Sequence, residues 1–312
     1  MEQSFLAWLR GRVRELPSVA VGIGDDAAVI DVPVGKQLIA TTDTIIDGVD
    51  FVVSQHSLAD IGYKAIAVNL SDIAAMGAEP TSALVTLSLP SQDATRTAAG
   101  VYEGILECAK LFGIAIAGGD ISVYEGPLSI SVTLLGTVPT GGAWLRSGAK
   151  EGDAIVLTGP VGGSLLGRHL RPMPRVELAS RLRKLIDVHA AMDVSDGLSL
   201  DLDRLCAASG VGAELDLATI PIHPDAVTRS EVLGGRKAIE HALGDGEDFE
   251  LILALDPKAF EGIQATHPEL ALHRIGTFVG RTGIWSRTAN DMKRLSPSGF
   301  VHGERRSQTS QT

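Results

Sequence analysis

The stretch IGYKAIAVNLSDIAAM, residues 61–76, is apolar on nearly every side when it is wound as a helix. Ser57 precedes it and Asp60 follows three positions later, a pattern related to the helix capping box. A glycine and a proline after the stretch are typical of a helix end. We therefore predict a buried helix from Ser57 to Met76. Asp72 falls in its interior, where neither a cap nor a turn explains an acidic side chain.

Five short stretches place aspartate within or at the end of an apolar run. They read Gly24-Asp25-Asp26, Thr41-Thr42-Asp43, Ser71-Asp72, Gly118-Gly119-Asp120 and Asp193-Val194-Ser195-Asp196-Gly197. Buried carboxylates without partners are costly, and several that converge repel one another unless cations lie between them. Carboxylates and hydroxyls are hard oxygen ligands that suit Mg²⁺, whose coordination is often completed by substrate phosphates. The five stretches together predict a magnesium site that handles phosphates.

Each stretch alone also has an ordinary interpretation. Gly-Asp-Asp is common in turns, and Asp193 or Asp196 alone is explained as a helix N-cap. Thr41 and Thr42 suit a strand, in which Thr41 and Asp43 share one face and Thr42 takes the other. The magnesium hypothesis therefore depends on the set and not on any one member.

The overall composition and charge of the chain exclude several classes of protein. The 312 residues are 45% hydrophobic and 21% charged, the balance of a folded chain long enough for two domains. The formal net charge of −11 argues against a nucleic-acid partner, because phosphate backbones attract Lys and Arg patches. With no run of 18 apolar residues and no signal-peptide pattern, we expect a cytoplasmic protein without a membrane partner. Cys108 and Cys206 read as buried, reduced thiols.

Several common catalytic motifs do not occur in the sequence. It has no P-loop, no protein-kinase H-R-D or D-F-G piece, no H-E-x-x-H or paired C-x-x-C zinc motif, and no G-x-S-x-G elbow. The turn Gly159–Ser164 follows a predicted strand and opens a helix. It can offer backbone N–H groups to a phosphate or form a tight turn, and the sequence leaves both readings open. Arg146, in a glycine-rich connection, is a candidate to neutralise a phosphate.

Periodicity predicts strands and helices in two halves. Predicted helices cover 2–15, 93–112 and the segment up to 209, besides the buried helix above. Predicted strands cover 37–46, 83–89, 114–118, 128–138, 153–158, 213–217, 249–255, 274–279 and 283–287. The halves join at about 140–150, and we place the first domain at 1–145, the second at 146–303, and a flexible tail at 304–312.

In this order, the motifs resemble the thiamine-monophosphate kinase family. This family belongs to a larger ATP-binding group that includes aminoimidazole ribonucleotide synthetase. The matching pieces are GIGDDAAV (22–29), TTDTIIDGVDF (41–51), IGYKAIAVNLSDIAAMGAEP (61–80), AGGD (117–120), LRSGAKEGD (145–153), RHLRPMPR (168–175), MDVSDGLSLDL (192–202) and GDGEDFEL (244–251). They cover nearly the whole chain, and the stretch around YKAIAVNLSDIAAMGA is the most specific.

The resemblance implies a fold, an activity and a set of site residues. The fold is α+β, a two-domain aminoimidazole ribonucleotide synthetase-like fold with mixed and antiparallel sheets flanked by helices. The N-terminal domain would bind ATP and Mg²⁺ and form a homodimer, and the C-terminal domain would complete the nucleotide and acceptor sites. The reaction would transfer the γ-phosphoryl of ATP directly and in line to thiamine monophosphate, giving thiamine diphosphate, with several Mg²⁺ ions between the anions and no protein nucleophile.

The implied site residues fall into three groups. The implied metal ligands are Asp26, Thr41, Thr42, Asp43, Asp72, Asp120, Asp193 and Asp196. The implied nucleotide contacts are Gly119, Asp120, Arg146, Ser195 and, more weakly, Tyr102. The implied acceptor contacts are Asp50, Glu247 and Phe300, with Glu247 near the cationic thiazolium and Phe300 stacked on the thiamine rings.

Two departures from the family pattern concern the acceptor side. Asp50 stands where the family usually has His, and a carboxylate near a phosphate acceptor is repulsive unless a metal ion or an arginine intervenes. The segment before Arg168 is also shorter than in the family. Two alternatives therefore stay open: a related ATP-using enzyme with another acceptor, and a nucleotide-binding regulatory protein whose acceptor site has decayed.

Overall fold

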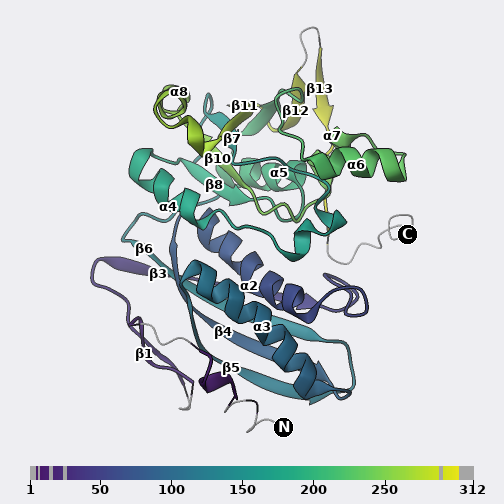
Figure 1. The fold of residues 1–312 in the computed structure, drawn as a ribbon. Helices are drawn as coiled ribbons and strands as arrows, with labels where there is room; N and C mark the ends of the chain where they lie inside the picture. The colour runs from purple at the N-terminus through teal and green to yellow at the C-terminus, as the bar shows by residue number, and fades with distance from the viewer. Residues whose placement is uncertain (1–4, 6–7, 14–16, 24–26, 288–290, 302–312) are drawn as a thin grey trace.

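The chain folds into two α+β domains, which lie one above the other in Figure 1. The computed structural model describes residues 5, 8–13, 17–23, 27–287 and 291–301. The predicted two-domain architecture, with mixed sheets flanked by helices, is confirmed. The division at residue 145 stays a prediction, and the tail predicted at 304–312 lies outside the described residues.

The first domain contains a two-stranded sheet, a four-stranded sheet and two long helices. Its elements are β1 (Val19–Val21), β2 (Val29–Ile30), β3 (Lys36–Ile46), α2 (Leu58–Ala75), β4 (Glu79–Pro90), α3 (Ala94–Phe112), β5 (Ala115–Tyr124) and β6 (Ser129–Pro139). The four-stranded sheet has the order β3-β6-β4-β5, and its neighbours are antiparallel except for β4 and β5. Helices α2 and α3 pack against one face of this sheet (Figure 1).

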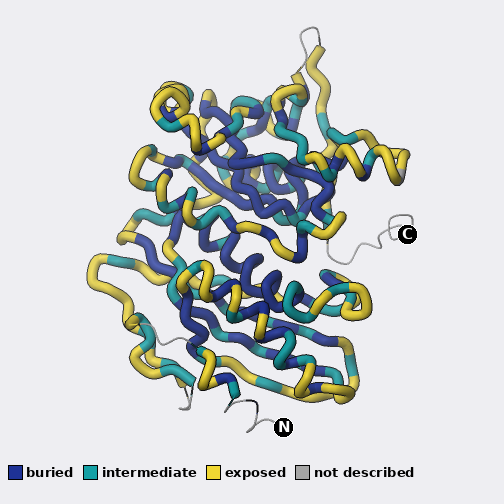
Figure 2. Tube along the Cα trace, in the orientation of Figure 1, coloured by how far each residue is buried: buried dark blue, intermediate teal, exposed yellow. Residues whose placement is uncertain are grey.

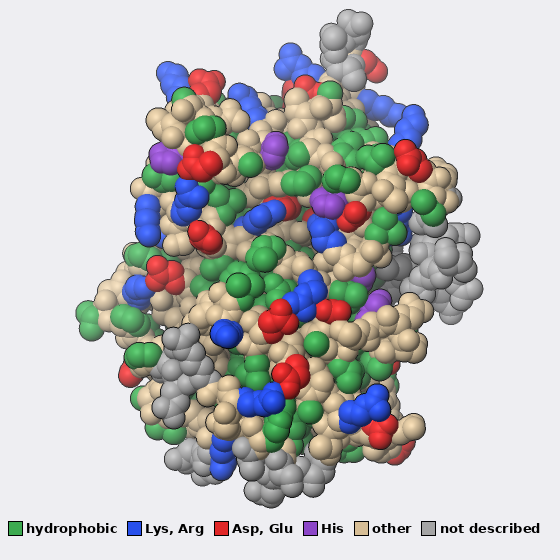
Figure 3. Space-filling model, viewed as in Figure 1, with side chains coloured by type: hydrophobic (Ala, Val, Ile, Leu, Met, Phe, Trp, Pro, Cys, Tyr) green, Lys and Arg blue, Asp and Glu red, His purple; other side chains and the backbone are tan. Residues whose placement is uncertain are grey.

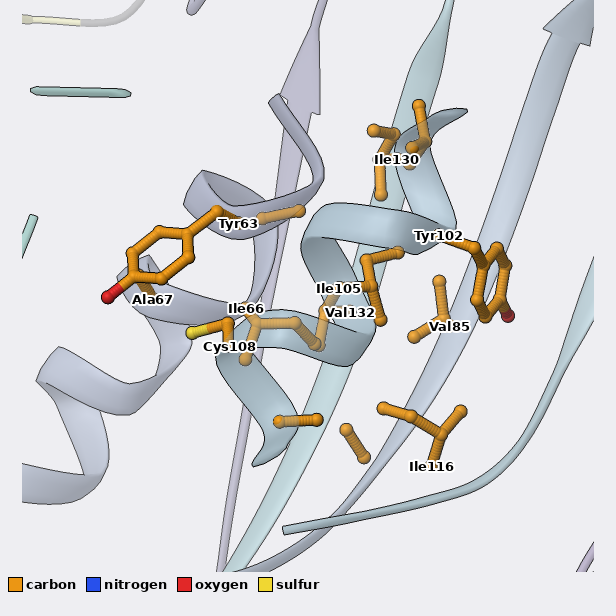
Figure 4. Close-up of a cluster of buried hydrophobic side chains, with 14 of the residues drawn as sticks. Tyr63, Ile66, Ala67, Val85, Tyr102, Ile105, Cys108, Ile116, Ile130 and Val132 are labelled. Atoms are coloured by element: carbon orange, nitrogen blue, oxygen red, sulfur yellow. The ribbon is translucent and has the colours of Figure 1, made fainter. Parts of the chain in front are cut away.

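The core of the first domain lies between this sheet and the two helices. Successive side chains of a strand point to opposite faces, and Ile130, Val132 and Leu134 of β6 are all fully buried. They belong to one hydrophobic cluster with Ile66 of α2 and Ile105 of α3, part of which Figure 4 shows. The opposite face of the sheet carries the less buried alternate residues.

Two glycines let α2 and α3 approach each other closely. A Cβ at Gly62 would lie 1.9 Å from the carbonyl oxygen of Val101, and a Cβ at Gly104 would lie 1.7 Å from that of Ala59. No side chain fits at such distances, so the helix crossing requires glycine at both positions. Helix α2 also contacts the second domain, which leaves its middle dark blue, or buried, in Figure 2.

The second domain is built on a seven-stranded mixed sheet. Its elements are β7 (Ala154–Leu157), two 3₁₀ turns η1 (Ser164–Leu166) and η2 (Arg168–Leu170), α4 (Val176–Leu185), β8 (Ala190–Asp193), α5 (Leu198–Ser209), β9 (Gly212–Leu215), α6 (Pro224–Leu233), α7 (Ala238–Gly244), β10 (Leu251–Leu255), α8 (Pro257–Thr266), η3 (Pro268–Leu270), β11 (His273–Val279), β12 (Gly283–Arg287) and β13 (Met292–Leu295). The strand order is β13-β12-β9-β11-β7-β10-β8.

Strand β10 shows why this sheet is covered on both faces. Ile252 and Ala254 belong to the hydrophobic cluster that contains α5, whereas Leu251, Leu253 and Leu255 belong to the cluster that contains α4 and α8. All five side chains are fully buried, the continuous apolar pattern of a strand packed on both sides. The same α4-side cluster includes the end of α2, so the two domains share packing there.

Most predicted elements of the first domain are confirmed, and those of the second only in part. The predicted helix at 57–76 is α2, and Ser57 caps it by accepting the N–H of Asp60 at 3.0 Å. The helix predicted at 2–15 falls partly outside the described residues. The helix predicted after 159–164 is only a 3₁₀ turn, and α4, α6, α7 and α8 were not predicted.

In the part of the chain that the structure describes, no helix is both long and apolar enough to span a lipid bilayer.

Candidate active site

A cavity of about 630 Å³ lies where α2 meets the second domain. Both domains contribute to its walls. The predicted site residues that line it are Asp43, Asp50, Asp72, Arg146, Asp193, Ser195, Asp196, Glu247 and Phe300. The fold therefore brings together nine residues that are up to 257 positions apart in the sequence, from Asp43 to Phe300.

In one part of the cavity wall, the adjacent α2 residues Ser71 and Asp72 take part in hydrogen bonds that involve acids of both domains. The Ser71 hydroxyl donates to Asp193 Oδ2 at 2.8 Å, and Asp72 Oδ2 accepts the Thr41 hydroxyl proton at 2.5 Å. Asp43 lies two positions beyond Thr41 on the same face of β3. Asp43 shares a side-chain hydrogen bond with Asp72. We call the connected group Asp43, Asp72 and Asp193 the hydroxyl-held acids, because hydroxyl groups hold Asp72 and Asp193.

The pKa values of all three hydroxyl-held acids are raised in the folded protein. Burial, followed by the charge of Asp72, raises the pKa of Asp43 to about 6, although solvent still reaches part of its side chain. Burial also raises the pKa of Asp72, against the hydrogen bond from Thr41 and the charge of Arg146. Asp193, 3% exposed, has a pKa well above its ordinary value, because it is buried and faces Asp72. A cation among these carboxylates would relieve the repulsion.

Asp196, the next acid along the chain, is held differently. Its Oδ2 accepts a hydrogen bond from Arg204 at 2.5 Å, and Arg204 also pairs with the buried Asp201 at 2.8 Å. Burial, above all, raises the pKa of Asp201 to about 6. Asp196 therefore lines the cavity with an arginine already beside it, and a metal ion at Asp196 would compete with Arg204.

The predicted acceptor contacts Asp50, Glu247 and Phe300 also line the cavity, and we call the part of the wall that they form its acceptor end. Asp50 Oδ2 accepts the backbone N–H of Ile46 at 2.8 Å, which closes the turn after β3. Phe300 is anchored by its backbone N–H, which donates to the carbonyl of Asp196 at 2.8 Å. Glu247 forms an ion pair with Lys64 at 2.5 Å. This end therefore combines acids, an aromatic ring and one buried lysine.

Three of the predicted residues lie elsewhere on the first domain. The Thr42 hydroxyl donates to the carbonyl of Val132, on the sheet face opposite Thr41 and Asp43. Gly119 and Asp120 belong to β5, at the sheet edge farthest from β3. Three strand spacings of about 4.8 Å separate these edge strands, or about 14 Å. Within this chain, the structure does not bring Thr42, Gly119 and Asp120 to the cavity.

Tyr102 lies in the hydrophobic core and not in the cavity wall. It is 4% exposed, its ring packs edge-on against Phe5 at 5.3 Å between ring centroids, and it lies beside Val85 in Figure 4. Asp26, the remaining predicted metal ligand, lies outside the described residues. The roles carried over to these two residues stay predictions.

The glycine turn 159–164 binds acids of its own chain. The backbone N–H of Gly162 donates to Asp248 at 2.8 Å, and that of Gly163 donates to Asp245 at 3.1 Å. Both glycines have φ in the left-handed region, at 94° and 75°, and a Cβ on either would meet backbone atoms closer than 3 Å. Of the two readings left open by the sequence, the structure supports the tight turn.

The basic segment RHLRPMPR, residues 168–175, pairs with acids of both domains. The pairs are Arg168 with Asp248 at 2.9 Å, Arg171 with Asp60 at 2.9 Å, and Arg175 with Glu250 at 2.7 Å. Burial raises the pKa of Asp248 to about 7 although Arg168 opposes the shift. Across the middle of the face in Figure 3, basic side chains lie next to acidic ones. These arginines therefore have structural partners.

Lys64 and Arg204 are two of the charged cavity residues that the sequence analysis did not single out; His56, His169, Arg229 and Asp245 also line the cavity. Lys64 gave a signal in the sequence, because a lysine inside a helix that is apolar all round must find a buried partner. Arg204 gave none, since an arginine on a half-exposed helix is ordinary.

The donor set at the hydroxyl-held acids suits Mg²⁺. Among the described residues, no group of three or more His, Cys, Asp and Glu side chains is arranged to hold a metal ion by itself. Mg²⁺ commonly takes only one or two protein carboxylates and completes its six ligands with water and substrate phosphates. Carboxylates of raised pKa without a hydrogen-bonded arginine fit that pattern, so a magnesium ion that arrives with a nucleotide fits the chemistry of these residues.

Comparison with known proteins matches both domains and nearly the full length. The N-terminal domain of AIR synthase related proteins matches residues 24–138, and their C-terminal domain matches residues 150–284. The thiamine-monophosphate kinase of Rhodopirellula baltica is 60% identical over 97% of this chain and 98% of its own length. The crystal structure of thiamine-monophosphate kinase from Stenotrophomonas maltophilia shares 36% identity, covers 90% of this chain and 94% of its own, and has a TM-score of 0.78.

A solved structure of AaThiL complexed with AMPPCP and TMP has a TM-score of 0.77 with this chain and 29% identity, and covers 96% of this chain and 95% of its own. The likeness therefore extends over both domains. Full-length identity to the Rhodopirellula protein and the two matched domains agree with the motif order of the sequence. This chain belongs to the thiamine-monophosphate kinase family, within the AIR synthase related proteins.

Proposed function

We propose that this chain transfers the γ-phosphoryl group of ATP to thiamine monophosphate, giving thiamine diphosphate and ADP. The observation that carries the proposal is a single cavity lined both by the hydroxyl-held acids and by the predicted acceptor contacts Asp50, Glu247 and Phe300. Two anions must meet for this reaction, one bringing the phosphoryl group and one accepting it. The family to which the chain belongs and the bound AMPPCP and TMP of AaThiL support this assignment.

The residues of the chain position the two substrates and neutralise their charges, and none forms a bond with the phosphoryl group. Phosphoryl transfer needs alignment and charge compensation more than covalent catalysis. Arg146 acts on the charges of Asp72 and Asp193 and lies in the cavity wall, where it would also meet a nucleotide phosphate. Ser195 lies between the two acids of its loop and offers a hydroxyl to the same region.

Mg²⁺ is the cation that we propose for the hydroxyl-held acids. Asp43, Asp72 and Asp193 would hold it together with phosphate oxygens and water. When bound, it supplies charge neutralisation and alignment of the two phosphates. Asp196 would join this set only where Arg204 releases it, because the two are ion-paired.

We also propose that the chain acts as a homodimer. The open face of the four-stranded sheet carries a row of cross-strand neighbours, Thr44, Ser131, Thr86 and Asp120. Exposed apolar side chains, including Leu38 and Tyr124, lie on the same domain. A second copy on this face would cover them and bring Asp120 near another chain. Light scattering after size exclusion should give about twice the 32.7 kDa chain mass, and a monomer at assay concentration would rule out this arrangement.

An assay of purified protein tests the proposed function directly. Mg-ATP and thiamine monophosphate are mixed with the protein, and thiamine diphosphate is measured by its fluorescent oxidation product. We expect product only when ATP, Mg²⁺ and thiamine monophosphate are all present, and none from free thiamine. Bound Mg-ATP without product would instead favour a different acceptor or a regulatory role, and would contradict the proposal.

A further inference from the structure

Lys64 is a buried cation in the wall of the cavity. Its side chain is 0% exposed, and it is the largest of the fully buried side chains among the described residues. Taking an ammonium group out of water is costly unless acceptors surround it. A lysine in this position therefore indicates that its contacts matter, because an apolar side chain would fill the space without that cost.

The contacts of Lys64 come from both domains. Its Nζ donates to the backbone carbonyl of Asp50 at 2.7 Å, in the turn after β3. It also donates to Glu247 Oε1 at 2.5 Å, in the loop between α7 and β10. Both partners lie at the acceptor end of the cavity. One buried ammonium therefore joins the two segments that carry the predicted acceptor contacts.

The loop that carries Glu247 is held in an unusual backbone conformation. Glu247 and Phe249 both have a φ of 53°, in the left-handed region that side chains other than glycine rarely adopt. The backbone N–H groups of these two residues donate to the carbonyls of Ser195 and Val194, at 2.7 and 2.9 Å. Asp248, between them, points instead to Gly162. This geometry directs Glu247 across the domain boundary toward Lys64.

Lys64 also brings a positive charge to the predicted acceptor contacts, through its ion pair with Glu247. Asp50 and Glu247 each add a carboxylate to the cavity wall. Near a phosphorylated acceptor, two acids repel unless a cation lies beside them. His169, in the same wall, does not supply that cation, because burial and then the charge of Lys64 lower its pKa to about 4. The ammonium of Lys64 lies within hydrogen-bond distance of both segments.

We propose that Lys64 is a positioning residue for the acceptor. Lys64 holds the Glu247 carboxylate and the turn at Asp50 in the arrangement that binds a phosphomonoester with a cationic ring. This inference rests on the proposed function and goes beyond it in naming what orients the acceptor contacts. The hydrogen bonds of Lys64 reach Asp50 and Glu247, which are predicted acceptor contacts, so Lys64 should affect the two substrates unequally.

Steady-state kinetics of Lys64→Met separate the two substrates. We expect the KM for thiamine monophosphate to rise about tenfold or more, while the KM for ATP stays within about twofold. The matched control is Lys36→Met, which removes an exposed lysine paired with Glu79 at 2.7 Å. It should leave both KM values unchanged. An unchanged KM for thiamine monophosphate in a folded Lys64→Met protein would show that Lys64 only ties the domains together.

The double variant Lys64→Met/Glu247→Gln keeps the test valid if Lys64→Met alone fails to fold. It removes both charges, so no unpaired acid is left in the wall. Because the two residues act through one contact, the double variant should lose no more acceptor affinity than Glu247→Gln alone. Losses that multiply would contradict the inference. A wild-type protein that makes no thiamine diphosphate would overturn the proposed function itself, whereas normal wild-type turnover with additive variants overturns only the role of Lys64.

Discussion

Two groups of buried acids lie within the second domain and at its boundary, and they are held by different partners. The hydroxyl-held acids Asp72 and Asp193 accept hydrogen bonds from Thr41 and Ser71. A second group, which we call the arginine-held acids, consists of Asp245, Asp248 and Glu250, each paired with an arginine within 3 Å.

The different hydrogen-bond partners indicate different roles for the two groups of acids. An arginine brings a full positive charge into direct contact with a buried carboxylate, which reduces the need for another cation. A hydroxyl donates one hydrogen bond but brings no charge, so the site keeps a demand for a cation that arrives with substrate. By this criterion the hydroxyl-held acids form the active site, and the arginine-held acids stabilise the loop that presents Glu247.

Neutralising a hydroxyl-held acid should have the largest effect on activity. We expect Asp72→Asn to lower kcat by roughly 10³-fold, because it removes a charge that positions the cation, with a melting temperature equal to or above that of the wild type. Asp187→Asn is the matched control, since the Asp187 side chain is 93% exposed. Near-normal turnover by Asp72→Asn would place the cation elsewhere.

Breaking an arginine-held pair should lower stability and leave activity nearly unchanged. Arg175→Met leaves Glu250 buried beside Thr158 without its arginine. We expect the free energy of unfolding to fall by about 2–4 kcal/mol, with kcat and both KM values within a few-fold of wild type. Urea denaturation measures the first quantity. Arg181→Met, which breaks the exposed pair with Glu269, serves as the control and should change stability by less than about 0.5 kcal/mol. A stable Arg175→Met protein with lost turnover would reverse the assignment.

The pH dependence of stability tests the raised pKa of Asp43. In metal-free protein, a carboxyl whose pKa is raised by folding stabilises the protein below its unfolded pKa of about 4, and this contribution is lost as the pH rises through the folded value. For Asp43 that value is about 6. The melting temperature of wild type relative to Asp43→Asn should therefore fall between about pH 4 and pH 7 and stay level above that. Mg-ATP should reduce this fall at pH 8, and parallel curves for the two proteins would contradict the raised pKa.

The smallest effect is expected at the exposed arginine of the same basic segment. Arg171 pairs with Asp60, and its guanidinium lies 4.4 Å from the centre of the Tyr63 ring. Solvent screens such surface contacts, so Arg171→Ala should cost less than about 1 kcal/mol and leave kinetics unchanged. A loss as large as that of Arg175→Met would show that exposure does not distinguish these pairs.

Much of the first domain could be predicted from the sequence because its elements are long. Helix α2 has a cap at Ser57, an apolar body and a glycine stop, and its prediction at 57–76 agrees with Leu58–Ala75. The helices α4, α6, α7 and α8 have ten residues or fewer. Their patterns are too short to stand out from loops, and tertiary packing decides them.

Within the site, the sequence indicated the acids but not their partners. Asp72 was the strongest single signal, because no local role explains an acid in mid-helix. Strand alternation correctly separated Thr42 from Thr41 and Asp43. Tyr102 packs in the core, and Lys64 reaches Glu247, 183 positions away. Both contacts depend on packing between distant segments, which no local sequence pattern encodes.

The most direct test of this account is the position of the bound cation. Crystals grown with AMPPCP and Mn²⁺ in place of Mg²⁺ give anomalous difference peaks at each metal. The account predicts a peak within about 2.5 Å of carboxylate oxygens of Asp43, Asp72 or Asp193. Peaks that contact only the nucleotide, or that lie at Asp245, Asp248 or Glu250, would contradict the claim that the hydroxyl-held acids are the metal site.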